Sequence, residues 1–71
     1  MEPDMIIIPH ILLQVGDTIR IPQPQWEEIL ATVLWVEWGV LRVQAEWNVF
    51  IYHWGFFVQK EDWSYLPYIM N

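Results

Sequence analysis

The clearest pattern in the chain is an alternation of apolar and polar residues along residues 40–47. One face of this segment carries Leu41, Val43, Ala45 and Trp47, and the other carries Arg42, Gln44 and Glu46. Because successive side chains of a β-strand point to opposite sides of a sheet, this period of two predicts a half-buried strand. Residues 18–21 alternate in the same way after the turn residues Gly16 and Asp17, which predicts a first strand there.

Three more segments, residues 31–38, 49–58 and 64–68, have the β-branched and aromatic composition that is typical of strands. Gly39 permits a tight reversal between the strands on either side of it. Residues 49–58 differ from the others because both of their faces are apolar, and Gly55 predicts a bulge or bend within them. Together these segments predict an all-β fold, namely a small five-stranded barrel.

The chain is short enough for a single barrel domain at residues 15–71, preceded by an apolar N-terminal arm at residues 1–14. Residues 5–8 predict a short strand in this arm, and Pro9 would confine that strand to the edge of a sheet. The arm is expected either to cover one open end of the barrel or to add a strand to a neighbouring chain.

The predicted core draws on most of the strands. Its members are Ile19, Ile21, Val33, Val36, Leu41, Val43, Ala45, Val58, Trp63 and Leu66. Trp47 is also assigned to the core, because it continues the apolar face of its strand. No inward position is forced on the remaining tryptophans, Trp26, Trp35, Trp38 and Trp54, and at least two of these four are expected at an interface.

The order of these elements resembles the SH3-like barrels of the Tudor and KOW type. Their hydrophobic-G-D-x-V-x-V opening is similar to residues 15–21, which read VGDTIRI. Their central hairpin is similar to ATV at residues 31–33 followed by GVLRV at residues 39–43. The strand, 3₁₀ turn and closing strand that end these barrels are similar to residues 58–66, which include EDW. The resemblance covers residues 15–66 and implies a fold and a binding role, not a reaction.

Each related family suggests a different ligand. Tudor domains hold methylated lysine or arginine in aromatic cages, and the resemblance offers Trp35, Trp38 and Tyr52 as walls, with Glu37 as the acid. KOW domains commonly bind RNA, but this chain lacks their basic surface. The type II dihydrofolate reductases are also SH3-like, and VFIY at residues 49–52 is similar to their V-Q-I-Y active-site stretch. In that comparison a phenylalanine replaces the ligand-binding glutamine, and the basic pore for the NADPH phosphates is absent.

Composition narrows the classes of function. The 71 residues are 55% hydrophobic, with six tryptophans and no cysteine, so disulfides and thiolate zinc sites are excluded. A chain of this length buries only about 60% of its unfolded surface, so surplus apolar side chains are expected on the surface or against another chain. The net charge of −6, with Arg20, Arg42 and Lys60 as the firm cations, disfavours nucleic acid and anionic membranes and favours a basic partner.

No residue pattern predicts catalysis, a metal or a cofactor. A metal site needs three or four converging ligands, and the two histidines, His10 and His53, stand far apart in the chain. His53 is interpreted as a turn or interface residue. Ser64 is the one serine and has no base pattern around it, while the acid pairs at residues 27–28 and 61–62 are expected to be solvated.

The sequence therefore favours a non-enzymatic, homo-oligomeric protein-interaction module, cytoplasmic because no targeting segment is recognisable. The predicted contact patch joins aromatic residues to rim acids: Trp35, Trp38, Tyr52, Trp54, Glu37 and Glu46. Two alternatives stay open. One is an acidic inhibitor from a mobile element that mimics nucleic-acid charge on a host protein, and the other is a small oligomeric reductase of the type II dihydrofolate reductase kind. Acids in a row at phosphate-like spacing would favour mimicry, whereas acids scattered at a rim favour recognition.

Overall fold

The computed structural model describes residues 5–24 and 27–68. Its elements are β1 (Ile7–Pro9), the 3₁₀ helix η1 (His10–Leu12), β2 (Thr18–Pro22), β3 (Glu28–Glu37), β4 (Val40–Ala45), β5 (Asn48–Tyr52), β6 (Phe56–Gln59) and β7 (Ser64–Pro67). The chain is therefore all-β, as the alternation predicts. In the part of the chain that the structure describes, no helix is long and apolar enough to cross a membrane.

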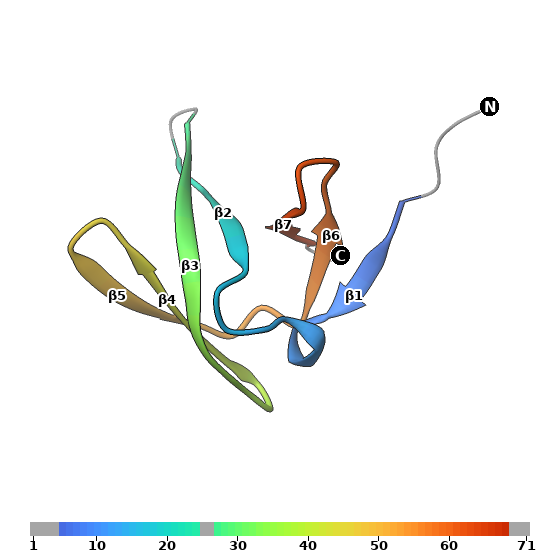
Figure 1. Cartoon of the computed structure of the whole chain (residues 1–71), viewed down its shortest axis with the longest axis horizontal. Helices are drawn as coiled ribbons and strands as arrows, with labels where there is room; N and C mark the ends of the chain where they lie inside the picture. The colour runs from blue at the N-terminus through green and yellow to red at the C-terminus, as the bar shows by residue number, and fades with distance from the viewer. Residues whose placement is uncertain (1–4, 25–26, 69–71) are drawn as a thin grey trace.

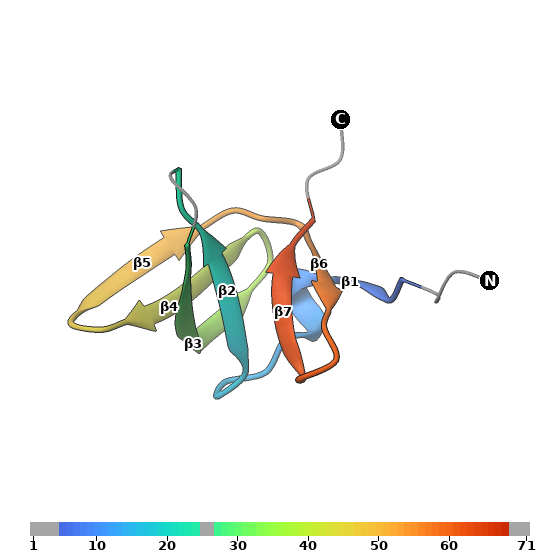
Figure 2. The same cartoon turned by 90° about the horizontal axis from the view of Figure 1, so that it is seen from above.

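The seven strands form one strongly curved sheet in the order β1-β6-β7-β2-β3-β4-β5 (Figure 1). Neighbouring strands are antiparallel except β2 and β7, which run parallel and share two residue pairs, Thr18 with Ser64 and Ile19 with Tyr65. This short junction joins two wings, one of β2–β5 and one of β1, β6 and β7. The outermost strands, β5 and β1, lie on opposite sides of the molecule in both views (Figures 1 and 2).

The expected five-stranded barrel is not what the structure shows, because the sheet has seven strands and does not close. One additional strand comes from the N-terminal arm, where β1 pairs with β6 of the same chain. Another arises because the apolar run at residues 49–58 is divided into β5 and β6. The predicted bend at Gly55 therefore separates two strands, which lie in different wings of the sheet.

The core lies on the concave side of the sheet and contains nine buried apolar residues: Leu13, Ile19, Ile21, Ala31, Val33, Leu41, Val43, Ala45 and Phe57. Six of these were predicted from the alternation, and Val36 packs against the cluster while partly buried. Phe57 is the largest side chain that is fully enclosed. It comes from the β1-β6-β7 wing, so this ring carries the packing between the two wings.

Four core predictions are wrong. Trp47 and Trp63 are 94% and 74% exposed, because each occupies a turn between strands. Val58 and Leu66 are only partly buried and lie opposite one another in the β6–β7 pair. They fall on the convex face, since the residue next to Val58 is the buried Phe57 and neighbouring side chains of a strand alternate. Trp26 lies outside the described residues.

Two of the turns place a bulky residue in a left-handed conformation. Glu46, between β4 and β5, has φ 56°, and Trp63, between β6 and β7, has φ 64°. A side chain with a Cβ atom is strained there by about 1–2 kcal/mol, which glycine avoids. Both hairpins are therefore stabilised by the pairing of their strands and not by favourable turn residues.

We expect Val43→Ala to lower the free energy of unfolding by about 1–3 kcal/mol, because this fully buried β4 side chain would leave a cavity. Val49→Ala, the same change on the exposed β5 strand, should alter it by no more than about 0.5 kcal/mol. Urea unfolding of the two variants measures the difference. Equal losses would show that the concave side is not the core.

We expect Glu46→Gly to stabilise the protein by about 0.5–1 kcal/mol, since the strain relieved exceeds the extra unfolded-state freedom of glycine. Glu46→Ala removes the same charge but keeps the Cβ atom, so it should give no such gain. Thermal unfolding of both variants provides the comparison. If alanine stabilises as much as glycine, the effect comes from charge and not from backbone strain.

Candidate functional site

The convex face of β3, β4 and β5 carries a row of exposed side chains across three neighbouring strands. Trp35 pairs with Arg42, and Arg42 pairs with Ile51, so the three side chains lie side by side. They face away from the core because the neighbours of Arg42 along β4, Leu41 and Val43, are fully buried. Trp35 is 54% and Ile51 is 55% exposed, so the row is open to a partner.

A β-bulge in β3 places Trp35 on this face. The pairing of β3 with β4 shifts by one residue between Val33 and Trp35, with Leu34 as the extra residue. Strict alternation from the buried Val33 would have put Trp35 into the core and Val36 on the surface. The bulge reverses that phase, so Val36 lies opposite the buried Leu41 and Trp35 points outward.

The two predicted rim acids lie at opposite ends of β4. Glu37 follows Trp35 by two residues and shares its convex face, and Trp38, in the next turn, is 81% exposed. Glu46 lies in the turn that begins directly after β4. A six-residue strand is about 17 Å long, so the acids bracket the row along the strand direction and do not touch.

The other predicted aromatic residues belong to the concave side. Tyr52 lies opposite the buried Leu41, and its ring stacks on Trp54 with centroids 4.0 Å apart. Phe50 stacks on Tyr52 with centroids 6.1 Å apart, and Phe57 meets Trp54 edge to face at the same distance. Burial raises the pKa of Tyr52 above its ordinary value, as expected for a phenol packed among rings.

The structure therefore divides the predicted patch. Trp35 and Glu37 share the convex face, Trp38 follows Glu37 in the chain, and Tyr52 and Trp54 stack on the concave side. An aromatic cage with Trp35 and Tyr52 as adjacent walls is not formed. The prediction missed Ile51 and Arg42 as parts of the convex row, although the alternation of Arg42 with the buried Leu41 and Val43 carries that signal. We call the convex side chains Leu34, Trp35, Arg42, Val49 and Ile51 the convex row, with Glu37 at its rim.

Two histidines hold the β3–β4 turn next to this row. The Nε2 atom of His10 lies 2.8 Å from the carbonyl oxygen of Glu37 and 2.9 Å from the backbone nitrogen of Gly39. His53 Nδ1 donates to the carbonyl oxygen of Gly39 at 2.8 Å. The rings of Trp38 and His10 meet edge to face, with centroids 6.3 Å apart. His53, interpreted from the sequence as a turn or interface residue, lies in the segment 53–55 that connects β5 to β6, while the buried position of His10 had no signal in the sequence.

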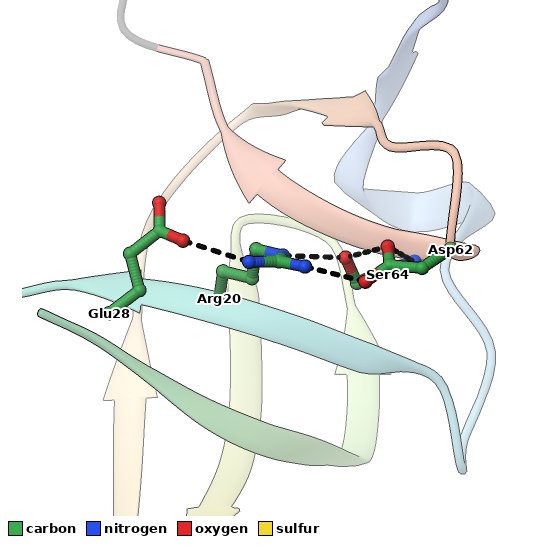
Figure 3. A network of polar contacts seen from close by, with 4 residues as sticks. All are labelled: Arg20, Glu28, Asp62 and Ser64. Atoms are coloured by element: carbon green, nitrogen blue, oxygen red, sulfur yellow. Dashed lines mark hydrogen bonds and ion pairs between the residues drawn. The ribbon is translucent and has the colours of Figure 1, made fainter.

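A second polar cluster fastens the junction between the wings (Figure 3). Arg20, on β2, donates from Nε to the Ser64 hydroxyl at 2.8 Å and pairs with Glu28 at 3.1 Å and with Asp62. Asp62 also accepts hydrogen bonds from the Ser64 hydroxyl and from the Ser64 backbone N–H. These bonds from Ser64, followed by the one from Arg20, lower the pKa of Asp62 to about 2.

This cluster is suited to holding the fold and not to nucleophilic chemistry. A general base works best with a pKa near the operating pH, and a carboxylate with a pKa of about 2 is a weak base. The Ser64 hydroxyl accepts from Arg20 while it donates to Asp62, so it is committed on both sides. Among residues 5–24 and 27–68, no group of three or more histidine or acidic side chains is placed to hold a metal ion.

Comparison of the chain with protein-family models, curated proteins and solved structures finds no match.

We expect the Arg20–Asp62–Ser64 cluster to make stability depend on acid pH. The pKa of Asp62 is about 2 in the folded chain and 3.8 ordinarily, so the unfolded chain takes up the proton first. The stabilisation is therefore complete above about pH 3.8 and is lost as the pH falls towards 2. Asp62→Asn should lower the melting temperature at neutral pH, and the difference from the parent should vanish near pH 2.

Glu61→Gln is the matched control, because it removes a neighbouring exposed carboxylate from the same turn. Its melting temperature should follow that of the parent across the acid range. A pH-independent loss in Asp62→Asn would instead mean that the side chain acts through shape alone.

Proposed function

We propose that the protein is a non-enzymatic interaction module that binds a protein partner on the convex row and also associates with itself. The observation that carries the proposal is the exposure of Trp35 and Trp38 on and beside one face of the β3–β4 hairpin. Tryptophan is the residue most enriched at binding hot spots, because it buries a large area with few rotatable bonds. In the SH3-like resemblance, which remains a prediction, the barrel would likewise serve binding.

Charge supports a partner with a basic or cationic group. Glu37 and Glu46 bracket the convex row, and the chain carries a net charge of −6. Rim acids of this kind steer a basic partner towards the surface and raise the rate of association. Arg42, in the middle of the row, would in turn pair with an acidic group of the same partner.

The positions of the acids favour recognition over mimicry of nucleic acid. Glu28 and Asp62 both pair with Arg20, so part of their charge is neutralised within the chain. Glu37 and Glu46 stand beyond opposite ends of β4, a strand about 17 Å long, whereas neighbouring phosphates of one nucleic-acid strand are much closer. We therefore retain ordinary protein recognition as the proposed function.

We expect Trp35→Ala and Trp38→Ala to weaken partner binding by about 2 kcal/mol or more, roughly thirtyfold, if each is a hot spot. The measurement is affinity capture from the source cell by the immobilised full chain, followed by titration of the captured protein. Trp63→Ala is the matched control, because Trp63 lies in the other wing and is 74% exposed, between Trp35 at 54% and Trp38 at 81%.

The partner should be retained by the parent and by Trp63→Ala, and lost by Trp35→Ala and Trp38→Ala after their folding has been checked by circular dichroism. Glu37→Gln should mainly slow association at low salt. Capture that is equal for all four proteins would place the binding surface elsewhere.

A further inference from the structure

The β5 strand is an unprotected sheet edge. It pairs with β4 on one side, and no described strand pairs with its other side. Its five residues, Asn48, Val49, Phe50, Ile51 and Tyr52, include no charged residue and no proline. Natural edge strands usually carry such residues, because a flat apolar edge with free N–H and C=O groups pairs readily with another strand.

The register identifies the backbone groups that remain free. Ala45 and Asn48 pair across the two-residue turn at Glu46 and Trp47, so they are bonded to each other. Bonded and non-bonded pairs alternate along an antiparallel ladder, which directs the N–H and C=O groups of Phe50 and Tyr52 towards β4 as well. The same groups of Val49 and Ile51 consequently point to the open side of the edge.

The opposite edge of the sheet is better protected. The β1 strand has three residues and ends at Pro9, which has no N–H group to donate. It also lies on the other side of the molecule from β5 (Figures 1 and 2). The two edges are therefore poorly matched for head-to-tail growth, whereas β5 is fully suited to pair with a copy of itself.

We propose that two copies of the chain pair through β5, antiparallel and related by a two-fold axis that passes beside Phe50. Val49 of one copy then faces Ile51 of the other, and these residues exchange backbone hydrogen bonds on both sides of the axis. The two sheets become one continuous sheet. This arrangement, which rests on the self-association in the proposed function, names the partner as a second copy and the contact as a strand edge.

Side-chain chemistry supports the same register. Val49 and Ile51 are 57% and 55% exposed on the convex face, and the pairing sets each against the other type, a favourable β-branched cross-strand pair. On the concave side the two Phe50 rings, each 38% exposed, become direct neighbours at a non-bonded pair. No charged side chain lies on β5, so two chains of net charge −6 meet at a neutral strand.

The size of the contact predicts a reversible dimer. A pair of five-residue strands buries less than the roughly 1,200 Å² at which standard interfaces begin, so we expect dissociation in the micromolar range. Because the contact uses backbone groups of Val49 and Ile51, it leaves Trp35 and Trp38 accessible on the hairpin beyond it.

Sedimentation velocity of the full chain over a micromolar concentration series tests the dimer. Ile51→Pro removes the outward N–H while sparing the bonds to β4, so it should raise the dimer dissociation constant at least about tenfold. Val49→Lys should act in the same direction by placing a charge on each copy at the edge. Val15→Lys introduces the same charge at an exposed apolar residue outside the sheet and should dimerise like the parent.

Circular dichroism checks that each variant is folded. If Ile51→Pro does not fold, the comparison of Val49→Lys with Val15→Lys decides whether β5 forms the dimer contact. A parent that stays monomeric, variants that dimerise like the parent, or open-ended oligomers would each overturn the β5 pairing. Capture of the partner by Trp35 and Trp38 is measured separately. A monomer that still binds its partner through those residues would therefore refute the dimer and leave the partner-binding surface standing.

Discussion

The parallel pairing of β2 with β7 is the contact on which the rest of this structure depends. Two residue pairs connect the β2–β5 wing to the β1-β6-β7 wing, and within the described residues no other strand pairing does so. The Arg20–Asp62–Ser64 cluster fastens this junction from the convex side, while Phe57 packs against the buried residues of β2–β4 from the concave side. The histidine bonds to the β3–β4 turn tie the wings together at a second place, since His10 also bonds to Gly55 next to β6.

This arrangement has more apolar side chains than its core can hold. The concave side buries nine of them, and residues as large as Trp35, Trp38, Trp47 and Trp63 remain mostly exposed. A small sheet has a large surface for its volume, so the excess follows from chain length as much as from sequence. What distinguishes this chain is where the excess is placed: on the convex row, at three turns and along the β5 edge.

The two proposed contacts use different atoms of the same hairpin region. Side chains of the convex row would recognise a partner, whereas backbone groups of β5 would recognise a second copy. Pairing of two β5 strands would also extend the convex face across both chains, because the sheet would continue through the axis. A dimer would thus present two convex rows to one partner, and binding at both would increase the apparent affinity without any new contact.

The sequence by itself determined the fold class, the faces of β2 and β4 and the positions of several turns. Alternation between Val40 and Ala45 identified Leu41, Val43 and Ala45 as core. In a strand, residues two apart share a face of the sheet, so an apolar period of two marks the buried face. Only the tertiary structure decided the rest. The bulge at Leu34 turned Trp35 outward. The break at Gly55 placed Phe57 on β6, from which it packs against the buried residues of β2–β4. The pairing of β1 with β6 and of β2 with β7 joins residues 46 to 51 positions apart in the chain, and no local pattern specifies such partners. Local periodicity reports which side of a strand is apolar, but the partner of that strand is chosen by the packing of the whole chain.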